Sequence, residues 1–260
     1  MTMWSRALLA AKARAFGLHV SISVVVFAAV IAVVIGMWFP QPYFSVDGGL
    51  AMIALAAAVD LGIGPLITFL VYRPGRRDNA LNFAVIGFLQ AAALTWGVHI
   101  LYSQRPLYSV YVGAPVKMFF PVTEELIRES APPGPELTSR ATSHPPLVFA
   151  QPGVRNAHTF NALVSAFLDE PTALSTTHLW VPIEGDALAT VAAEARDRQT
   201  LESKDPDAGR LLDEFLAERD ARFEDFAFVP LRGRYRSALL ALKKSDGSLA
   251  GVVYANVLPQ

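Results

Sequence analysis

Three long segments without charge, all within the first 104 residues, constrain this chain more than any other feature. No charged side chain lies between Ala15 and Val46 or between Ala80 and Tyr102, and Asp60 alone interrupts the stretch from Gly49 to Tyr72. A helix rises about 1.5 Å per residue, so about 20 apolar residues cross a hydrocarbon layer of roughly 30 Å. We therefore predict three transmembrane helices, at residues 18–39, 49–72 and 80–102.

The first apolar segment has one alternative interpretation, a cleaved signal peptide, because Arg6, Lys12 and Arg14 give it a basic start. Its apolar run is too long for a signal peptide. It also ends in Met37-Trp38-Phe39-Pro40, without the small residues of a cleavage site. We therefore expect a retained membrane anchor.

Charge divides the chain into two chemically different parts. Residues 1–104 carry 9 of the 45 charged side chains, whereas residues 105–260 carry the other 36, a density that is ordinary for a soluble domain. We expect a transmembrane region over 1–104 and a soluble domain over 105–260. A single soluble domain, a disordered chain and a bundle confined to the membrane are excluded. The net charge of −1 gives no nucleic-acid footprint.

Basic residues beside the spans predict the orientation of the membrane region, because cytoplasmic loops are enriched in Lys and Arg. The first loop, Pro40 to Gly48, has no basic residue, whereas the N-terminal flank and the second loop have three each. We therefore place the N-terminus and the second loop in the cytoplasm, and the first loop and residues 105–260 outside. The basic residues on the predicted cytoplasmic side are Arg6, Lys12, Arg14, Arg73, Arg76 and Arg77.

The soluble part shows both strand and helix patterns. Asp246-Gly247 is a strong hairpin signal between the last two strands. The predicted fold class is therefore an α-helical membrane bundle followed by a mixed α+β or α/β domain that ends in an antiparallel hairpin. Strands are expected at 107–112, 116–122, 179–183, 226–231, 235–243 and 248–256. Helices are expected after Thr123, at 156–168, at 186–199 and after Asp205-Pro206, with a loop at 131–146.

The sequence carries no familiar catalytic signature. It has no cysteine, which excludes disulfides, Cys-ligated zinc and a thiol nucleophile. It also lacks G-x-S-x-G, P-loop, G-x-G-x-x-G and H-E-x-x-H patterns. His144, His158 and His178 are scattered without metal-ligand spacing. We therefore assign no catalytic, cofactor-binding or metal-ligating residue and expect no cofactor.

Three arginines alternate near the end of the chain, at Arg232, Arg234 and Arg236. On a strand they would share one face, because successive side chains point to opposite sides. Such a face can hold a phosphate or an acidic partner. A solvated surface, or pairing with the acids of the same domain, is the simpler interpretation, and the sequence leaves both open.

Asp60 is the candidate site in the membrane, because an ionised carboxylate there costs about 2.5–3.5 kcal/mol. At about 1.5 Å per residue, Asp60 lies about 18 Å above Tyr72 and Gln90 lies about 15 Å above Ala80, so the two polar groups can meet. Either Asp60 is protonated and bonds to Gln90 inside the bundle, or it faces a groove and contacts another protein's transmembrane helix. The residues that follow Asp60 favour close helix approach and a kink, and are Gly62, Gly64 and Pro65.

The arrangement of these motifs resembles the TfpX/TfpZ family of type IV pilin accessory proteins. The resemblance is close from residue 16 to about 112 and looser over the last 30 residues, and it does not extend to residues 131–225. The matching stretches are Gly17-Leu18-His19, Trp38 to Phe44, Val59 to Thr68, Arg73 to Arg76, Gln90, Arg105 to Tyr108, and Val229 to Arg234.

The resemblance implies an inner-membrane protein of a Gram-negative bacterium, with its C-terminal domain in the periplasm. It implies a non-enzymatic helper, or chaperone, in type IV pilus assembly that acts with the major pilin and, as further candidates, with other inner-membrane pilus components. It supplies no established functional residue. Two other classes stay open: a membrane-anchored sensor or ligand-binding module, and a membrane-bound hydrolase without a familiar motif.

Overall fold

The computed structural model describes residues 6–128, 137, 144–151 and 177–258. The chain forms two compact units. The first unit combines Met1–Trp38 with Gly49–Ser103, and the second combines Phe39–Gly48 with Gln104–Gln260. The predicted helix at 156–168, most of the predicted loop at 131–146, and His158 lie outside the described residues.

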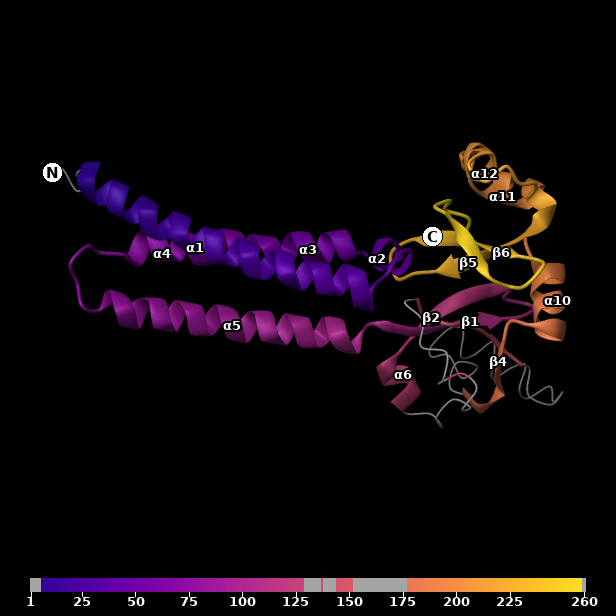
Figure 1. Cartoon of the computed structure of the whole chain (residues 1–260), viewed down its shortest axis with the longest axis horizontal. Coiled ribbons are helices and arrows are strands. Elements are labelled where there is room, and N and C mark those ends of the chain that lie inside the picture. Colours follow the sequence, from indigo (N-terminus) through magenta and orange to yellow (C-terminus); the bar gives the residue numbers. More distant parts are fainter. Residues whose placement is uncertain (1–5, 129–136, 138–143, 152–176, 259–260) are drawn as a thin grey trace. The chain divides into compact units, whose positions relative to one another are not determined.

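Three long apolar helices form the first unit (Figure 1). Each is long and apolar enough to cross a membrane. The second and third helices agree with the predicted segments to within one residue at each end, whereas the first begins 12 residues before the predicted start at residue 18. The first is α1 (Arg6–Val33), extended by a π-helical turn (Val34–Trp38). The second is α3 (Gly49–Ala57), a π-helical segment (Ala58–Ile63) and α4 (Gly64–Val71), and the third is α5 (Asn79–Ser103).

Large apolar side chains point outward from these helices. Leu50, Leu55 and Phe88 are each more than 70% exposed. A water-soluble protein rarely exposes so much contiguous apolar surface, whereas lipid tails surround such a surface without cost. The outward residues therefore agree with insertion of this unit into a membrane.

Lys12 holds the end of α4 against α1. Its ammonium group donates to the backbone carbonyls of Phe69 (2.8 Å) and Leu70 (2.9 Å), which belong to the last turn of α4. The last carbonyls of a helix have no partner within the helix, and a cation there also interacts favourably with the helix dipole. Phe16 packs edge-to-face on Phe69, with ring centroids 6.3 Å apart. These contacts fix the packing of α1 on α4.

A mixed sheet forms the centre of the second unit, with the strand order β4-β3-β1-β2-β5-β6-β7 among the described residues (Figure 1). The β1–β3 and β2–β5 pairs are parallel, and the other neighbours are antiparallel. The strands are β1 (Pro106–Val112), β2 (Met118–Thr123), β3 (Leu147–Ala150), β4 (Trp180–Pro182), β5 (Phe226–Arg232), β6 (Ser237–Lys243) and β7 (Leu249–Val253). The hairpin predicted at Asp246-Gly247 is confirmed, because β6 and β7 pair around it and Gly247 has the positive φ (72°) that the turn requires.

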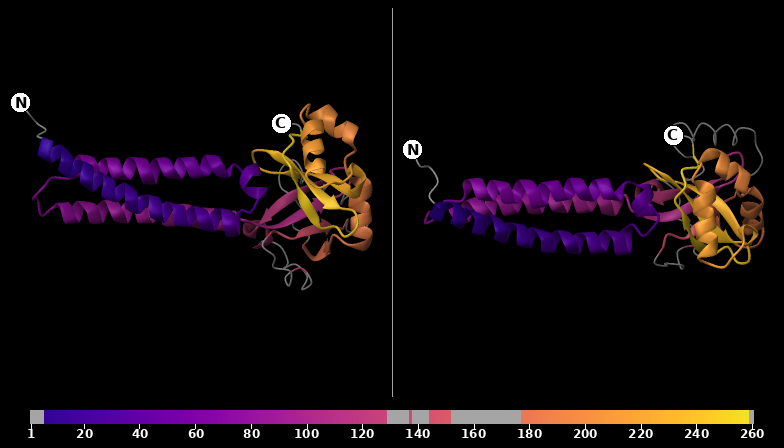
Figure 2. Two further views of the ribbon diagram at one scale, coloured as in Figure 1. Left: turned by 45° about the horizontal axis from the view of Figure 1, so that its top comes forward. Right: turned by 90° about the horizontal axis from the view of Figure 1, so that it is seen from above.

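Helices lie on both faces of this sheet (Figure 2). On one face, the amphipathic pair α11 (Arg198–Lys204) and α12 (Ala208–Ala217) packs onto β5, β6 and β7 in a core that includes Leu212, Phe215 and Phe228. On the other face, α10 (Gly185–Glu194) is held by Glu194, which accepts a hydrogen bond from the Tyr111 hydroxyl (2.8 Å). The short α6 (Glu124–Arg128) follows β2 directly.

Two predicted elements differ from the structure. The helix predicted at 186–199 is broken into α10 and α11, because the Arg196 amide donates to the Phe228 carbonyl of β5 (3.0 Å) and Asp197 caps α11 through the Thr200 amide (2.7 Å). The predicted start of α12 is also different. The Asp205 carboxylate bonds to the amides of Asp207 and Asn256 and leaves the first turn of the helix uncapped by a side chain.

The loop between the first two long helices, residues 39–48, is part of the second unit. It contains the one-turn helix α2 (Tyr43–Val46). The Tyr43 hydroxyl bonds to Ser109 Oγ of β1 (2.7 Å) in a fully buried position, and the Val46 carbonyl accepts from the amides of Tyr235 (3.0 Å) and Arg236 (3.1 Å). The predicted boundary near residue 104 placed this loop in the transmembrane region. Only its tertiary contacts assign it to the sheet domain.

Burial raises the pKa of Tyr43 to about 12, although its hydrogen bond to Ser109 acts in the opposite direction. An ordinary tyrosine has a pKa near 10. Between about pH 10 and 12 the unfolded chain therefore loses the Tyr43 proton while the folded chain keeps it. The unfolded state then binds fewer protons, so the stability contributed by this group falls as pH rises.

Tyr43→Phe should destabilise the chain by about 1 kcal/mol at pH 8, because Ser109 loses its buried partner. The wild-type advantage should shrink by about 1.4 kcal/mol per pH unit above pH 10 and vanish near pH 11. The measurement is the free energy of unfolding of the full chain in detergent at several pH values. Tyr254→Phe removes a hydroxyl that bonds to Gln41 Oε1 (2.8 Å) at a half-exposed position, and it is the control for loss of a hydroxyl near the same loop. A Tyr43→Phe curve parallel to that of the wild type would contradict the role given to Tyr43.

Candidate functional site

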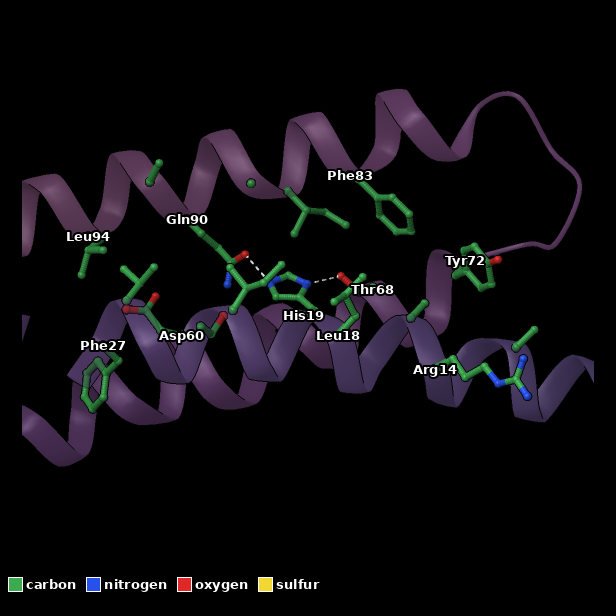
Figure 3. Close-up of a pocket in the computed structure, with 18 residues that line it drawn as sticks. Arg14, Leu18, His19, Phe27, Asp60, Thr68, Tyr72, Phe83, Gln90 and Leu94 are labelled. Carbon is green, nitrogen blue, oxygen red and sulfur yellow. Dashed lines mark hydrogen bonds between the residues drawn. The ribbon is translucent and has the colours of Figure 1, made fainter. Parts of the chain in front are cut away.

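A cavity of about 750 Å³ lies inside the first unit, between α1, the second long helix and α5 (Figure 3). Most of its lining is apolar, with Leu18, Phe27 and Leu94 among the contributing residues. Its polar groups come from all three long helices and are Arg14, His19, Asp60, Thr68, Tyr72 and Gln90. Six polar groups around one cavity between apolar helices are unusual, because polar groups at membrane depth are costly unless they face protein or a cavity.

His19 connects the three helices through two hydrogen bonds, drawn in Figure 3. Its Nε2 lies 2.8 Å from Gln90 Oε1 on α5, and its Nδ1 lies 2.6 Å from Thr68 Oγ1 on α4. An amide oxygen only accepts, so Nε2 carries the proton that is donated to Gln90. In the neutral ring Nδ1 then accepts the proton of the Thr68 hydroxyl. Both ring nitrogens are therefore satisfied within the unit.

Gly64 makes room for the Gln90 side chain. A Cβ atom built on Gly64 would overlap the Gln90 amide nitrogen, and Gly64 and Pro65 are both buried. Pro65 lies in the first turn of α4 and has no amide hydrogen, so the backbone before it cannot continue a regular α-helix. The preceding six residues form the π-helical segment, in which the Gly64 amide donates to the Val59 carbonyl. This segment carries Asp60.

Asp60 faces the cavity without a hydrogen-bond or ion-pair partner among the described residues. Figure 3 shows its carboxylate directed into the same space as the Gln90 amide. His19 bonds to the Gln90 oxygen, and no hydrogen bond joins Asp60 to Gln90 among the described residues. Asp60 is directed into the cavity, and its contact with a transmembrane helix of another protein stays a prediction.

The remaining predicted membrane residues divide into two groups. Gly64, Pro65 and Gln90 take part in the packing around His19, whereas Gly62 is exposed and has open space around its Cα. The sequence did not indicate that His19 and Thr68 bond across helices, or that Lys12 caps a helix in addition to marking the basic flank. The available signal was the presence of polar side chains inside each predicted span, among them His19, Thr68 and Gln90.

The three arginines lie elsewhere, in the second unit, where the condition for a shared face, one continuous strand, is not met. Arg232 ends β5, and Arg234 and Arg236 lie in the connection to β6, so they do not share the face of one strand. The reason is the loop at residues 39–48, whose Val46 carbonyl and Asp47 carboxylate take the backbone amides that a longer strand would use. The Arg234 guanidinium donates to Gln104 Oε1 (2.7 Å).

The lining of the cavity in the first unit is typical of a binding site, because it is mostly apolar with a few polar groups. Across the described ranges, no group of three His, Asp or Glu side chains is placed to hold a metal ion. The cavity offers an apolar wall and one carboxylate that can accept a hydrogen bond or a cation.

Comparisons with known proteins give the family. A family model described as Fimbrial assembly protein FimB matches residues 7–48. Three relatives from Dichelobacter nodosus are each 32% identical over 101 residues, or 38% of this chain: the fimbrial assembly proteins of serogroup E1, of serogroups C1 and C2, and of serogroup I. The match spans 77% of the C1 and C2 protein and 39% of each of the other two. The chain therefore belongs to the fimbrial assembly protein family. No solved structure matches it significantly.

The segment matched by the family model contains several of the contacts described above. It includes α1 with Lys12 and His19, which hold α4 and α5, and the loop at residues 39–48, which joins the second unit. The matched segment therefore contributes packing contacts to both units.

Gly64→Ala should push the Gln90 amide away and break its bond to His19. A hydrogen bond between membrane helices contributes about 0.6 kcal/mol on average and up to about 1.7 kcal/mol, so the loss of stability should fall in that range. The measurement is thermal unfolding of the full chain in detergent. Gly62→Ala is the matched control two residues away, where the added methyl group meets nothing, and it should be neutral or slightly stabilising. Equal effects at the two glycines would contradict the role given to Gly64.

Proposed function

We propose that this protein is a non-enzymatic, membrane-anchored assembly factor for type IV pili that acts directly on the pilin subunit. The proposal combines the family membership with the resemblance to TfpX/TfpZ proteins. The observation that carries it is the cavity with Asp60, which has an apolar wall and a carboxylate without a partner among the described residues. In this proposal the transmembrane helix of the pilin lies against the cavity and inserts side chains into it, and the second unit meets the part of the pilin outside the membrane.

The proposed topology places the N-terminus in the cytoplasm of a Gram-negative cell and the second unit in the periplasm. The basic flanks support this orientation. A chain with three spans must also put the loop after the first span on the same side as the residues after the third. Residues 39–48 and 104–260 fold into one unit, which supports three spans and is the same for either orientation.

Single cysteines should report this topology, because the natural chain has none and gives no background. Gln41→Cys and Ser245→Cys, at exposed positions of the second unit, should react with a thiol reagent that enters the periplasm but does not cross the inner membrane. Arg77→Cys, in the loop between the second and third spans, should react only after the cells are opened. Labelling of all three positions from one side would contradict the three-span arrangement.

Asp60→Asn keeps the shape of the side chain and removes its charge. If Asp60 accepts a donor from the pilin helix, this change should lower the amount of pilin that copurifies with the full chain from membranes by about 5- to 30-fold, the effect of about 1–2 kcal/mol. Surface pili should decrease in parallel. Asp78→Asn, at an exposed carboxylate in the loop after α4, is the matched control and should leave both unchanged.

Copurification that is unaffected by Asp60→Asn would contradict the role of the cavity. A photocrosslinking residue at Leu94, which lines the same cavity, separates this outcome from a wrong choice of partner. Capture of the pilin supports the proposed function. Capture of no pilin, together with a small molecule retained by the second unit, favours the ligand-binding alternative.

A further inference from the structure

The turn between β5 and β6 forms an exposed basic tip, defined here as residues Arg232–Arg236. All three arginines in it are exposed, and Tyr235 is 68% exposed. The Gly233 amide donates to the Arg236 carbonyl (3.0 Å), which closes the turn. The sequence alone is compatible with arginines that hold a phosphate and with arginines that are only solvated. The fold shows which groups contact each of them.

The backbone of the basic tip is fixed to the loop at residues 39–48. The Val46 carbonyl accepts from the amides of Tyr235 and Arg236, and the Asp47 carboxylate accepts from the Arg234 amide (2.9 Å). Gly233 lies so close to Val46 that a Cβ atom on it would overlap the Val46 backbone and side chain. The ring of Tyr235 lies against Gly48 in the same way. The tip is therefore held rigidly through its backbone, which leaves the arginine side chains directed to other partners.

These contacts join the basic tip to residues that adjoin two of the long helices in the sequence. Asp47 and Gly48 directly precede Gly49, the first residue of α3, and a residue spans at most about 3.6 Å of extended chain. The Arg234 guanidinium bonds to Gln104, the residue that follows the last residue of α5. When these helices span a membrane, Asp47 and Gln104 lie at most two residues, or about 7 Å, along the chain from a span end, and hydrogen bonds hold the tip to both. The two headgroup layers together add about 10–15 Å to a hydrocarbon core of about 30 Å, so these residues are kept close to the headgroups.

The charges of the tip are only partly used within the protein. The guanidinium groups of Arg232 and Arg236 have no hydrogen-bond or ion-pair partner in the described ranges of the chain. Two acids face Arg234: Asp47 directly, and Glu125 through the bridging amide of Gln104. Burial raises the pKa of Asp47, and the nearby Arg234 counteracts that rise. Arg232 and Arg236 therefore remain available for an anion from outside the chain.

We propose that the basic tip binds the phosphate headgroups of anionic phospholipids in the leaflet on the side of the second unit. Arg232 and Arg236 contact the phosphates, since a guanidinium offers a planar pair of donors that matches them. Tyr235 lies in the interface between headgroups and acyl chains, where amphipathic aromatic side chains concentrate. This binding adds a third type of anchor, beside the spans and the covalent links, and fixes the orientation of the second unit at the membrane surface.

The test uses the full chain in detergent micelles to which phosphatidylglycerol or phosphatidylcholine is added, with bound lipid counted by native mass spectrometry. We expect phosphatidylglycerol to be retained in preference to phosphatidylcholine. The double variant R232Q/R236Q should weaken this retention by about fivefold per arginine, which corresponds to about 1 kcal/mol for each basic residue near an anionic surface. Because the side chains are exposed, the variant should unfold at the same temperature as the wild type.

The matched control is K243Q/K244Q, which removes the same charge from exposed residues at the opposite end of β6. It should retain phosphatidylglycerol as the wild type does. Equal retention by all three proteins, or equal binding of the zwitterionic lipid, would overturn the proposal. So would loss of the effect when inorganic phosphate alone competes at low concentration, since that outcome indicates a site for free phosphate. A pilin captured through the tip in place of lipid would overturn it as well.

Discussion

The ten residues between the first two long helices are the segment on which the second unit depends. Val46 and Tyr43 connect them to the β5–β6 turn and to β1, so a short loop between helices becomes part of the sheet domain. The buried Tyr43–Ser109 hydrogen bond and the two amides on the Val46 carbonyl leave few alternative positions for this loop. Because its two ends continue into helices, the sheet domain has three covalent connections to the first unit, where a domain appended only at the end would have one.

In the first unit, polar groups between apolar helices need hydrogen-bond partners within the protein. His19 satisfies both of its ring nitrogens with Thr68 and Gln90, and Lys12 takes the carbonyls at the end of α4. Asp60 is left facing the cavity, carried by a π-helical segment that ends at Gly64 and Pro65. A π-helical segment often occurs where a helix is shaped for function. The satisfied polar groups rigidify the unit, whereas the Asp60 carboxylate has no partner among the described residues and supports the proposed binding.

Much of the outline could be predicted because it depends on local pattern. The length of the apolar stretches predicts the long helices, and the Asp246-Gly247 turn predicts the β6–β7 hairpin. The sequence left two interpretations of Asp60 open, because spacing along a helix gives depth but not direction; in the structure His19 reaches the Gln90 oxygen from a third helix. The three arginines would share a face only on one continuous strand, and the amides that would extend β5 bond instead to a loop almost 190 residues away.

The sequence by itself determined that the chain has two chemically different parts, that three helices are long enough to span a membrane, and that one carboxylate lies among them. These properties follow from composition and from the rise of a helix, which neighbours along the chain decide. Only the tertiary structure decided that residues 39–48 join the sheet, that His19 connects three helices, and that the loop at residues 39–48 fixes the backbone of the arginine turn. Each of these depends on hydrogen bonds between residues far apart in the sequence, and no local pattern contains that information.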